Sequence, residues 1–238
     1  MPLTPRPSPL AGPLAGATIA FDLDGTLVDT APDLVGALNH VLREEALPEL
    51  PLASARLMVG RGARALIERG FAVAGARLDP VAAPALVERF IAVYLPRIAD
   101  ESRPFEGVEA ALDALAAAGA ALCVCTNKPT RLSLALLDAL NMTSRFAAIV
   151  GPDAAPAPKP DPRHLAAAIA AAGGRMDRAL MVGDSINDIA AARAAQVPSI
   201  VVSFGYTDIA PAELGADHLI EHFDALPALA RRLLSRPA

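Results

Sequence analysis

Two aspartates separated by one leucine follow a short apolar run near the start of the chain. They are Asp22 and Asp24, in the stretch FDLDGTLVDT of residues 21–30. Carboxylates this close repel each other, and a hard cation such as Mg²⁺ relieves that repulsion because it prefers oxygen ligands. One carboxylate can attack phosphorus as a nucleophile, while the other can donate and accept protons. The pair therefore favours metal-assisted chemistry at a phosphoryl group, and Gly25 would let the backbone turn closely beside it.

The elements that would position these aspartates alternate along the chain. Continuous apolar runs, typical of strands buried on both faces of a parallel sheet, cover residues 17–22, 121–126, 146–150, 179–184 and 199–204, with a short edge strand at 218–220. Helical patterns occupy residues 107–119, 130–141, 162–173 and 186–196. This alternation predicts an α/β fold with a doubly wound parallel sheet.

Polar residues follow the other predicted strands as well. The carboxyl ends of parallel strands lie at one edge of a sheet, where ligands bind in such folds. We therefore expect one cluster to contain Asp22, Asp24 and five residues from later strand ends: Thr126, Asn127, Lys159, Asp184 and Asp188. Carboxylates would hold a cation, and the ammonium, hydroxyl and amide groups would hold phosphoryl oxygens. The sequence thus predicts a combined metal and phosphate site.

One connection is too long for a simple crossover between strands. Residues 31–100 read as a series of helices inserted after the first strand. We predict a helical cap over 31–100, a catalytic core formed by 16–30 and 101–238, and a flexible, proline-rich N-terminal extension over 1–15.

Composition excludes several functional classes. The chain has 238 residues, a formal charge of −5 and no basic block, so nucleic acid is not an expected partner. No apolar run is long enough to span a bilayer, and we expect a cytoplasmic protein. The only cysteines, Cys123 and Cys125, would fill the core from one face of a strand. Nothing in the sequence decides between a monomer and a homodimer.

Four motifs in order carry a resemblance to a known family. FDLDGTLVDT, VCTNK, APKPDP and GDSIND each follow a predicted strand. Together they resemble the motifs of the haloacid dehalogenase superfamily of phosphohydrolases, and the insertion over 31–100 is similar in position to the helical cap of one subtype. The resemblance implies a Rossmann-like core, Mg²⁺ as cofactor and a small phosphorylated metabolite as substrate.

The resemblance also implies a role for each matching residue. Asp22 would be the nucleophile and a magnesium ligand, and Asp24 the general acid and base whose backbone carbonyl also binds the metal. Asp184 would complete the protein ligands of magnesium. Asp188 would orient the metal site or the lysine. The phosphoryl group would be bound by Thr126, Asn127 and Lys159, of which the lysine neutralises both nucleophile and phosphate.

The cap would select the substrate. Gly60-Arg61-Gly62 interrupts helical sequence, and Arg61 could pair with an anionic substrate group. This turn is similar to the cap loop of bacterial phosphoglycolate phosphatases, although these usually have Asn where Arg61 stands. The resemblance implies hydrolysis of 2-phosphoglycolate, in carbohydrate metabolism, through an aspartyl-phosphate. Alternatives are a related phosphatase acting on pyrophosphate, sugar phosphates or nucleotides, and a β-phosphoglucomutase-like phosphotransferase.

Simpler interpretations stand beside these roles. Asp188 could merely favour the positive end of a helix, and Arg61 could be a surface charge on the cap. Lys128 is expected to be solvated rather than catalytic. His40, His164, His218 and His222 have no partners at metal-ligand spacing, so we expect surface or boundary positions for all of them.

Overall fold

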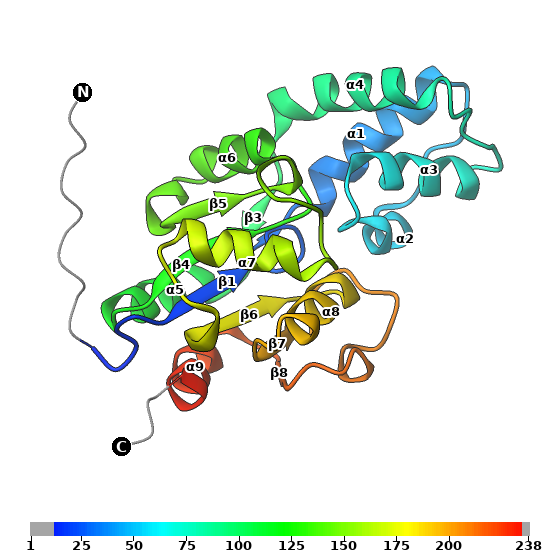
Figure 1. Ribbon diagram of the computed structural model, residues 1–238. Coiled ribbons are helices and arrows are strands. Elements are labelled where there is room, and N and C mark those ends of the chain that lie inside the picture. Colours follow the sequence, from blue (N-terminus) through cyan, green and yellow to red (C-terminus); the bar gives the residue numbers. More distant parts are fainter. Residues whose placement is uncertain (1–11, 235–238) are drawn as a thin grey trace.

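The computed structural model of the chain describes residues 12–234 (Figure 1). Its centre is a six-stranded sheet in the order β5-β4-β1-β6-β7-β8, and every neighbouring pair is parallel. The strands are β1 (Thr18–Phe21), β4 (Ala121–Cys125), β5 (Ala148–Val150), β6 (Ala179–Gly183), β7 (Ser199–Val202) and β8 (His218–Ile220). The α/β class and the parallel sheet predicted from the sequence are confirmed.

Helices cover both faces of this sheet. On one face α7 (Pro162–Ala171) contacts β1, β4 and β5, and α8 (Ile186–Ala194) contacts β6 and β7. On the other, α5 (Val108–Ala117) contacts β4, and α9 (Leu226–Leu234) contacts β6. The remaining core helix, α6 (Thr130–Ala139), packs against β5 at the sheet edge (Figure 1). This is the doubly wound arrangement, with the sheet buried between two helical layers.

Alternating residues of the strands supply the two apolar layers. Ile19 and Phe21 of β1 belong to the larger hydrophobic cluster, whereas Ala20 packs in a second cluster with Cys123 and Cys125. Successive side chains of a strand point to opposite faces, which is why the residues separate in this way. Both cysteines are free and fully buried, so the prediction that they fill the core from one face of a strand is confirmed.

A group of helices lies between β2 (Val28–Asp29) and β3 (Arg103–Pro104). It comprises α1 (Ala31–Glu44), α2 (Leu52–Ala55), α3 (Ala63–Val73) and α4 (Ala83–Tyr94), which pack on one another beyond one end of the sheet (Figure 1). In α1 the buried residues include Leu34, Leu38, Val41 and Leu42, the three- and four-residue spacing of one helix face. We refer to this group, residues 31–97, as the cap helices.

Three local features differ from the sequence-based expectations or were not foreseen. Within the segment 31–100 that was expected to be helical, residues 52–58 form only α2 and a 3₁₀ turn at Arg56–Met58, and the backbone then turns to positive φ at Gly60 and Gly62. The chain segments that lead into and out of the cap helices pair as the antiparallel strands β2 and β3. The helix α9 was not predicted at all.

Residues 12–15, which were predicted to belong to a flexible N-terminal extension, are part of the folded core. Residues 1–11 lie outside the described residues. Residues 12–15 form a turn against the core, in which Leu14 is fully buried and its N–H donates to the carbonyl of Ala118 at 2.9 Å. Burial of this leucine holds the segment in place, contrary to the flexibility expected for it. Within the described residues, no helix combines the length and the apolarity that crossing a membrane requires.

Candidate active site

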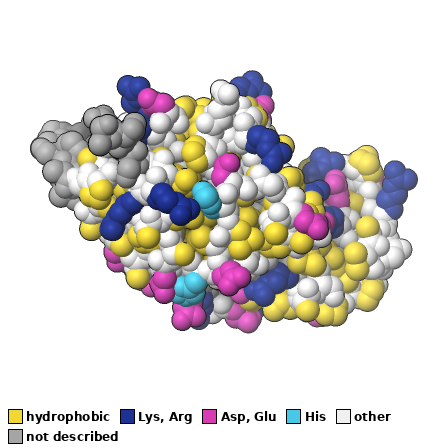
Figure 2. Space-filling view, turned by 90° about the horizontal axis from the view of Figure 1, so that it is seen from below, with side chains coloured by type: hydrophobic (Ala, Val, Ile, Leu, Met, Phe, Trp, Pro, Cys, Tyr) yellow, Lys and Arg dark blue, Asp and Glu magenta, His cyan; other side chains and the backbone are white. Residues whose placement is uncertain are grey.

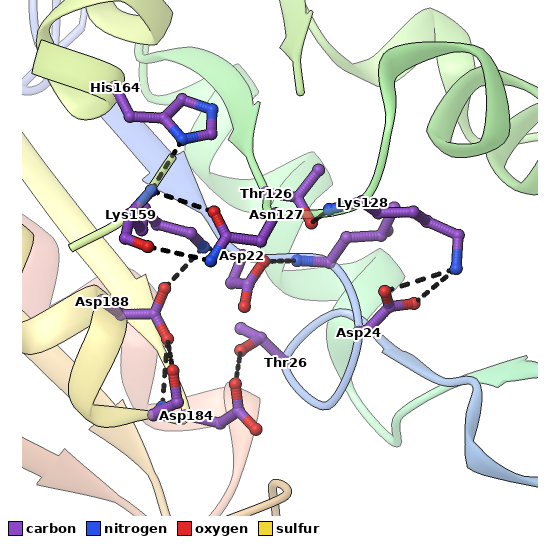
Figure 3. Close-up of polar contacts among 12 residues, drawn as sticks. Asp22, Asp24, Thr26, Thr126, Asn127, Lys128, Lys159, His164, Asp184 and Asp188 are labelled. Atoms are coloured by element: carbon purple, nitrogen blue, oxygen red, sulfur yellow. Dashed lines mark hydrogen bonds and ion pairs between the residues drawn. The ribbon is translucent and has the colours of Figure 1, made fainter. Parts of the chain in front are cut away.

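The carboxyl ends of three adjacent strands form the centre of the site. β1 lies between β4 and β6 in the sheet, so Asp22, Thr126 and Asp184, each directly after one of these strands, are brought to one edge (Figure 3). All three are at least 95% buried. The hydroxyl of Thr126 accepts a hydrogen bond from the Lys128 N–H at 3.2 Å.

A buried lysine neutralises two of the acidic residues. Lys159 Nζ lies 2.9 Å from Asp22 Oδ1 and 2.6 Å from Asp188 Oδ1. Burial alone would lower the pKa of this ammonium, but the charges of Asp188 and Asp22 raise it above its ordinary value. Lys159 therefore remains charged and holds the two carboxylates together.

The positive charge of Lys159 does not balance the negative charges of the three buried aspartates at the site. Asp22, Asp184 and Asp188 each offer a carboxylate oxygen, and these oxygens all lie within 4.8 Å of one another. Burial raises the pKa of Asp22 to about 7 despite the opposing effect of Lys159. Burial and the charges of Asp188 and Asp22 also raise the pKa of Asp184 well above its ordinary value. A divalent cation would bind these buried carboxylate oxygens and relieve the repulsion between them.

Asp188 is held by contacts on both of its oxygens. Oδ1 pairs with Lys159, and Oδ2 accepts from the N–H of Ser185 at 3.0 Å and from its hydroxyl at 2.7 Å. Ser185 and Asp188 form a capping box at the start of α8. The carboxylate thus stabilises the helix start and also fixes the position of the lysine.

Asp184 is positioned by its neighbours and by a glycine. Its Oδ1 accepts from the Thr26 hydroxyl at 3.1 Å, and its Oδ2 accepts from the Tyr206 N–H at 2.6 Å. Gly25 has a φ of +86°, and a Cβ there would lie 2.4 Å from Asp184 Oδ2. Only glycine fits this position, which agrees with the close backbone turn that Gly25 was predicted to allow after the two aspartates.

Two residues hold the backbone of Lys159. The amide of Asn127 donates to the Lys159 carbonyl at 3.0 Å and accepts from its N–H at 2.9 Å. The same N–H also donates to His164 Nδ1 at 3.1 Å, and His164 Nε2 lies 3.2 Å from the Val150 carbonyl. The side chain of Asn127 therefore positions the lysine in this structure, whereas its predicted contact with phosphate remains a prediction.

The expectation for His164 was wrong. It is fully buried rather than at the surface or a boundary, because α7 presents it inward between the Lys159 loop and the end of β5. Burial lowers its pKa, so the ring is neutral at pH 7. The Val150 carbonyl requires the proton on Nε2, which leaves Nδ1 as the acceptor.

The expectation for Lys128 was also wrong. It is 5% exposed, and its Nζ lies 3.0 and 3.3 Å from the two oxygens of Asp24. The nitrogen also lies 4.7 Å from the ring centre of Tyr94 in α4. Burial alone would lower the pKa of Lys128, but Asp24 and Tyr94 raise it above its ordinary value. A signal was present in the sequence, since Lys128 follows the same strand end as Thr126.

A pocket opens between this edge of the sheet and the cap helices, and the space within it, together with the adjoining open solvent, is about 490 Å³. Its core side includes Asp22, Asp24, Thr126, Asn127 and Lys128, and its cap side includes Val59, Leu66, Phe90 and Tyr94. Arg61 is exposed and instead lines a neighbouring hollow with Arg69 and Asn187. The structure thus brings together the predicted site residues of the core but leaves Arg61 outside this pocket.

Comparisons with known proteins agree with this arrangement. The sequence model of the haloacid dehalogenase-like hydrolase family matches residues 19–202. The phosphoglycolate phosphatase of Caulobacter vibrioides is 63% identical over 222 residues, which cover 93% of this chain and 94% of the relative. That of Agrobacterium fabrum is 48% identical over 238 residues, which cover 99% of both chains.

Solved structures include one similar over nearly the whole molecule. It is the crystal structure of a predicted phosphoglycolate phosphatase from Haemophilus somnus 129PT, which is 30% identical, with a TM-score of 0.84 and coverage of 91% of this chain and 98% of that one. Members of this group of phosphatases generally use a divalent metal, in keeping with the buried acidic cluster. The chain is thus a phosphoric monoester hydrolase similar to phosphoglycolate phosphatases, and it belongs to the haloacid dehalogenase-like hydrolase family.

Proposed function

We propose that the protein hydrolyses 2-phosphoglycolate to glycolate and phosphate, with Mg²⁺ as cofactor and an aspartyl-phosphate on Asp22 as intermediate. The observation that carries this proposal is the placement of Asp22. It lies on the wall of a pocket, 2.9 Å from a buried ammonium, with a second carboxylate, Asp24, lining the same pocket. The names of the relatives at 63% and 48% identity support the substrate.

The metal would be held by the side chains of Asp22 and Asp184 together with the backbone carbonyl of Asp24. Asp188 is a weaker ligand candidate because both of its oxygens are already in contact with Lys159 and Ser185. When bound, Mg²⁺ neutralises negative charge on the phosphoryl oxygens and on the carboxylates around them. Manganese and cobalt ions can bind similar ligands, so they should be tested beside magnesium.

In the first step an oxygen of Asp22 attacks phosphorus, and an O–P bond forms as the ester P–O bond breaks. The departing glycolate oxygen takes a proton from the Asp24 carboxyl, which lines the same pocket. In the second step Asp24 accepts a proton from water as the water oxygen attacks phosphorus. The bond to Asp22 then breaks and phosphate is released.

The remaining residues bind and position. Lys159 would stabilise the charge that develops on the phosphoryl oxygens, and the Thr126 hydroxyl would bind one of them. Asp188, Asn127 and His164 keep Lys159 in place through the contacts described above. The cap helices close the other side of the pocket and would exclude bulk water during the reaction. The assigned domain boundaries and a cytoplasmic location remain predictions.

The test is phosphate release by the purified protein from a panel of substrates. The panel contains 2-phosphoglycolate, pyrophosphate, p-nitrophenyl phosphate, hexose phosphates and nucleoside monophosphates, each with Mg²⁺ and with EDTA. We expect the highest kcat/KM for 2-phosphoglycolate, and loss of activity with EDTA and in Asp22→Asn. A higher kcat/KM for another phosphate would overturn the substrate assignment, and an isomerised sugar phosphate as product would indicate a phosphotransferase. Full activity in Asp22→Asn would overturn the mechanism.

A further inference from the structure

The chain uses lysine in an unusual way. Of its 21 lysine and arginine residues only two are lysines, Lys128 and Lys159. Both are buried at the site, with exposed fractions of 5% and 3%. The dark blue side chains on the surface in Figure 2 are therefore arginines. All the other residues in this set are arginines. We therefore infer that the two lysines stand where a compact ammonium is needed inside the protein.

The two ammonium groups lie on different sides of Asp22 (Figure 3). Lys159 contacts Asp22 and Asp188 and already has a role next to the phosphoryl group. Lys128 contacts neither of them and pairs with Asp24 instead. An ammonium has three N–H donors, and both hydrogen bonds of Lys128 Nζ go to the one carboxylate of Asp24. Lys128 therefore has donor capacity left for a ligand in the pocket.

A second polar group lies beside Lys128 without a partner. The hydroxyl of Tyr94 is buried and, among the residues that the structure describes, makes no hydrogen bond. Burial raises the pKa of Tyr94 to about 12, so this hydroxyl keeps its proton and can donate. Tyr94 and Lys128 both line the pocket, one from the cap helices and the other from the core.

Apart from Asp22, Asp24, Thr126 and Asn127 at the edge of the sheet, the rest of the surrounding wall is apolar. Leu34, Leu66, Phe90 and Leu132 line the pocket, and within residues 12–234 Lys128 is its only cationic lining residue. A sugar or a nucleotide would leave many hydroxyl or base groups facing these side chains without hydrogen bonds. On this apolar side of the pocket, one ammonium and one hydroxyl match a small, compact anion.

We propose that Lys128, assisted by the Tyr94 hydroxyl, binds the carboxylate of the substrate and so selects phosphate esters of small hydroxy acids. This assignment rests on the proposed function and names the residue that gives it specificity. The phosphoryl group occupies the side of Asp22 next to Lys159, and the carboxylate occupies the side next to Lys128. Because Tyr94 belongs to the cap helices, a bound carboxylate also links the cap helices to the core.

Another interpretation gives Lys128 no role beyond pairing with Asp24. Loss of Lys128 would then affect every substrate equally, because Asp24 transfers a proton to every leaving group. The carboxylate subsite instead predicts an effect that depends on the substrate's own charge. The comparison therefore uses 2-phosphoglycolate and its neutral amide, 2-phosphoglycolamide, which have the same shape.

The kinetic test measures kcat/KM for both compounds in the wild type, Lys128→Met and Arg131→Met. Arg131 is exposed and lies three residues after Lys128 in the chain. Its replacement by methionine removes one positive charge, as Lys128→Met does, but outside the pocket. We expect the wild type and Arg131→Met to prefer 2-phosphoglycolate by 100-fold or more, and Lys128→Met to lower this preference at least tenfold. Tyr94→Phe should lower it severalfold. An unchanged preference in Lys128→Met, or no preference in the wild type, would overturn the proposal.

A binding test separates failure of this proposal from failure of the proposed function. Protein labelled with ¹³C and ¹⁵N in lysine gives two side-chain signals, because there are two lysines, and Lys128→Met assigns them. We expect glycolate to shift the Lys128 signal and inorganic phosphate to shift mainly that of Lys159. A Lys128 signal unmoved at saturating glycolate would overturn the subsite. A shifted signal in a protein that does not hydrolyse 2-phosphoglycolate would keep the subsite and refute the substrate.

Discussion

Replacing Lys159 by methionine tests how the buried charges of the site are balanced. Its ammonium lies 2.9 Å from Asp22 and 2.6 Å from Asp188. Without it, two carboxylates whose nearest oxygens lie within 4.8 Å of each other would repel by at least about 3.5 kcal/mol at an effective dielectric constant of about 20.

We therefore expect Lys159→Met to lower the free energy of unfolding by about 4 kcal/mol at pH 7 in EDTA. This agrees with the range of about 3–5 kcal/mol for breaking a buried ion pair. If a carboxyl takes up a proton, its pKa in the folded variant lies above the unfolded value. The folded variant then binds more protons than its unfolded state, so the variant's own free energy of unfolding should rise by up to about 1.4 kcal/mol per pH unit as the pH is lowered toward 5.

The assay is urea denaturation followed by circular dichroism, with EDTA present. Asp188→Asn in the Lys159→Met background removes one repelling charge and should recover at least about half of the loss. Arg175→Met is the control, because Arg175 pairs with Asp177 at 2.7 Å but its side chain is 77% exposed. It should leave stability unchanged within error. A loss below about 1 kcal/mol for Lys159→Met, or a further loss in the double variant, would refute this account of the charges.

Three further predictions concern the metal, a glycine and a histidine. Mg²⁺ should raise the melting temperature of the wild type, and this rise should disappear in Asp184→Asn, as a thermal shift assay would show; an equal rise in the variant would place the ion elsewhere. Gly25→Ala should lower both stability and kcat, because the new Cβ would lie 2.4 Å from Asp184 Oδ2; a variant with wild-type kcat and melting temperature contradicts this. Burial lowers the pKa of His164, so below about pH 6.5 the unfolded chain binds a proton that the folded chain does not, and stability falls with pH. Urea denaturation at pH 5.5 and 7.5 should show a smaller fall in His164→Asn, and an equal fall would exclude His164 as a cause.

The elements and the strand-end residues could be predicted because both depend on local sequence. A continuous apolar run indicates a buried strand, and a polar residue directly after it must lie at the edge formed by the carboxyl ends of the strands. This is why Asp22, Thr126 and Asp184 could be placed before the structure was known. The edge strand at 218–220 was found in the same way.

The contacts between distant segments could not be predicted in this way. Lys128 and Asp24 are 104 residues apart, and Tyr94 reaches them only because α4 packs over the pocket. Periodicity shows that a residue is buried but not which side chain it faces. Lys128 was expected to be solvated and His164 to lie at the surface or a boundary, because the sequence does not show that Asp24 and the backbone of Lys159 are their neighbours. The pairing of β2 with β3 has the same origin.

The most direct test of the mechanism is to isolate the covalent intermediate on Asp22. In Asp24→Asn the second step lacks its base, and p-nitrophenyl phosphate has a leaving group that needs no proton, so the intermediate should accumulate. We predict a burst of nitrophenolate equal to the enzyme concentration and, after acid quench, one phosphoryl group on the peptide that contains Asp22. Neither should occur in Asp22→Asn/Asp24→Asn. A burst without phosphoprotein, or a phosphoryl group on any other residue, would contradict the account.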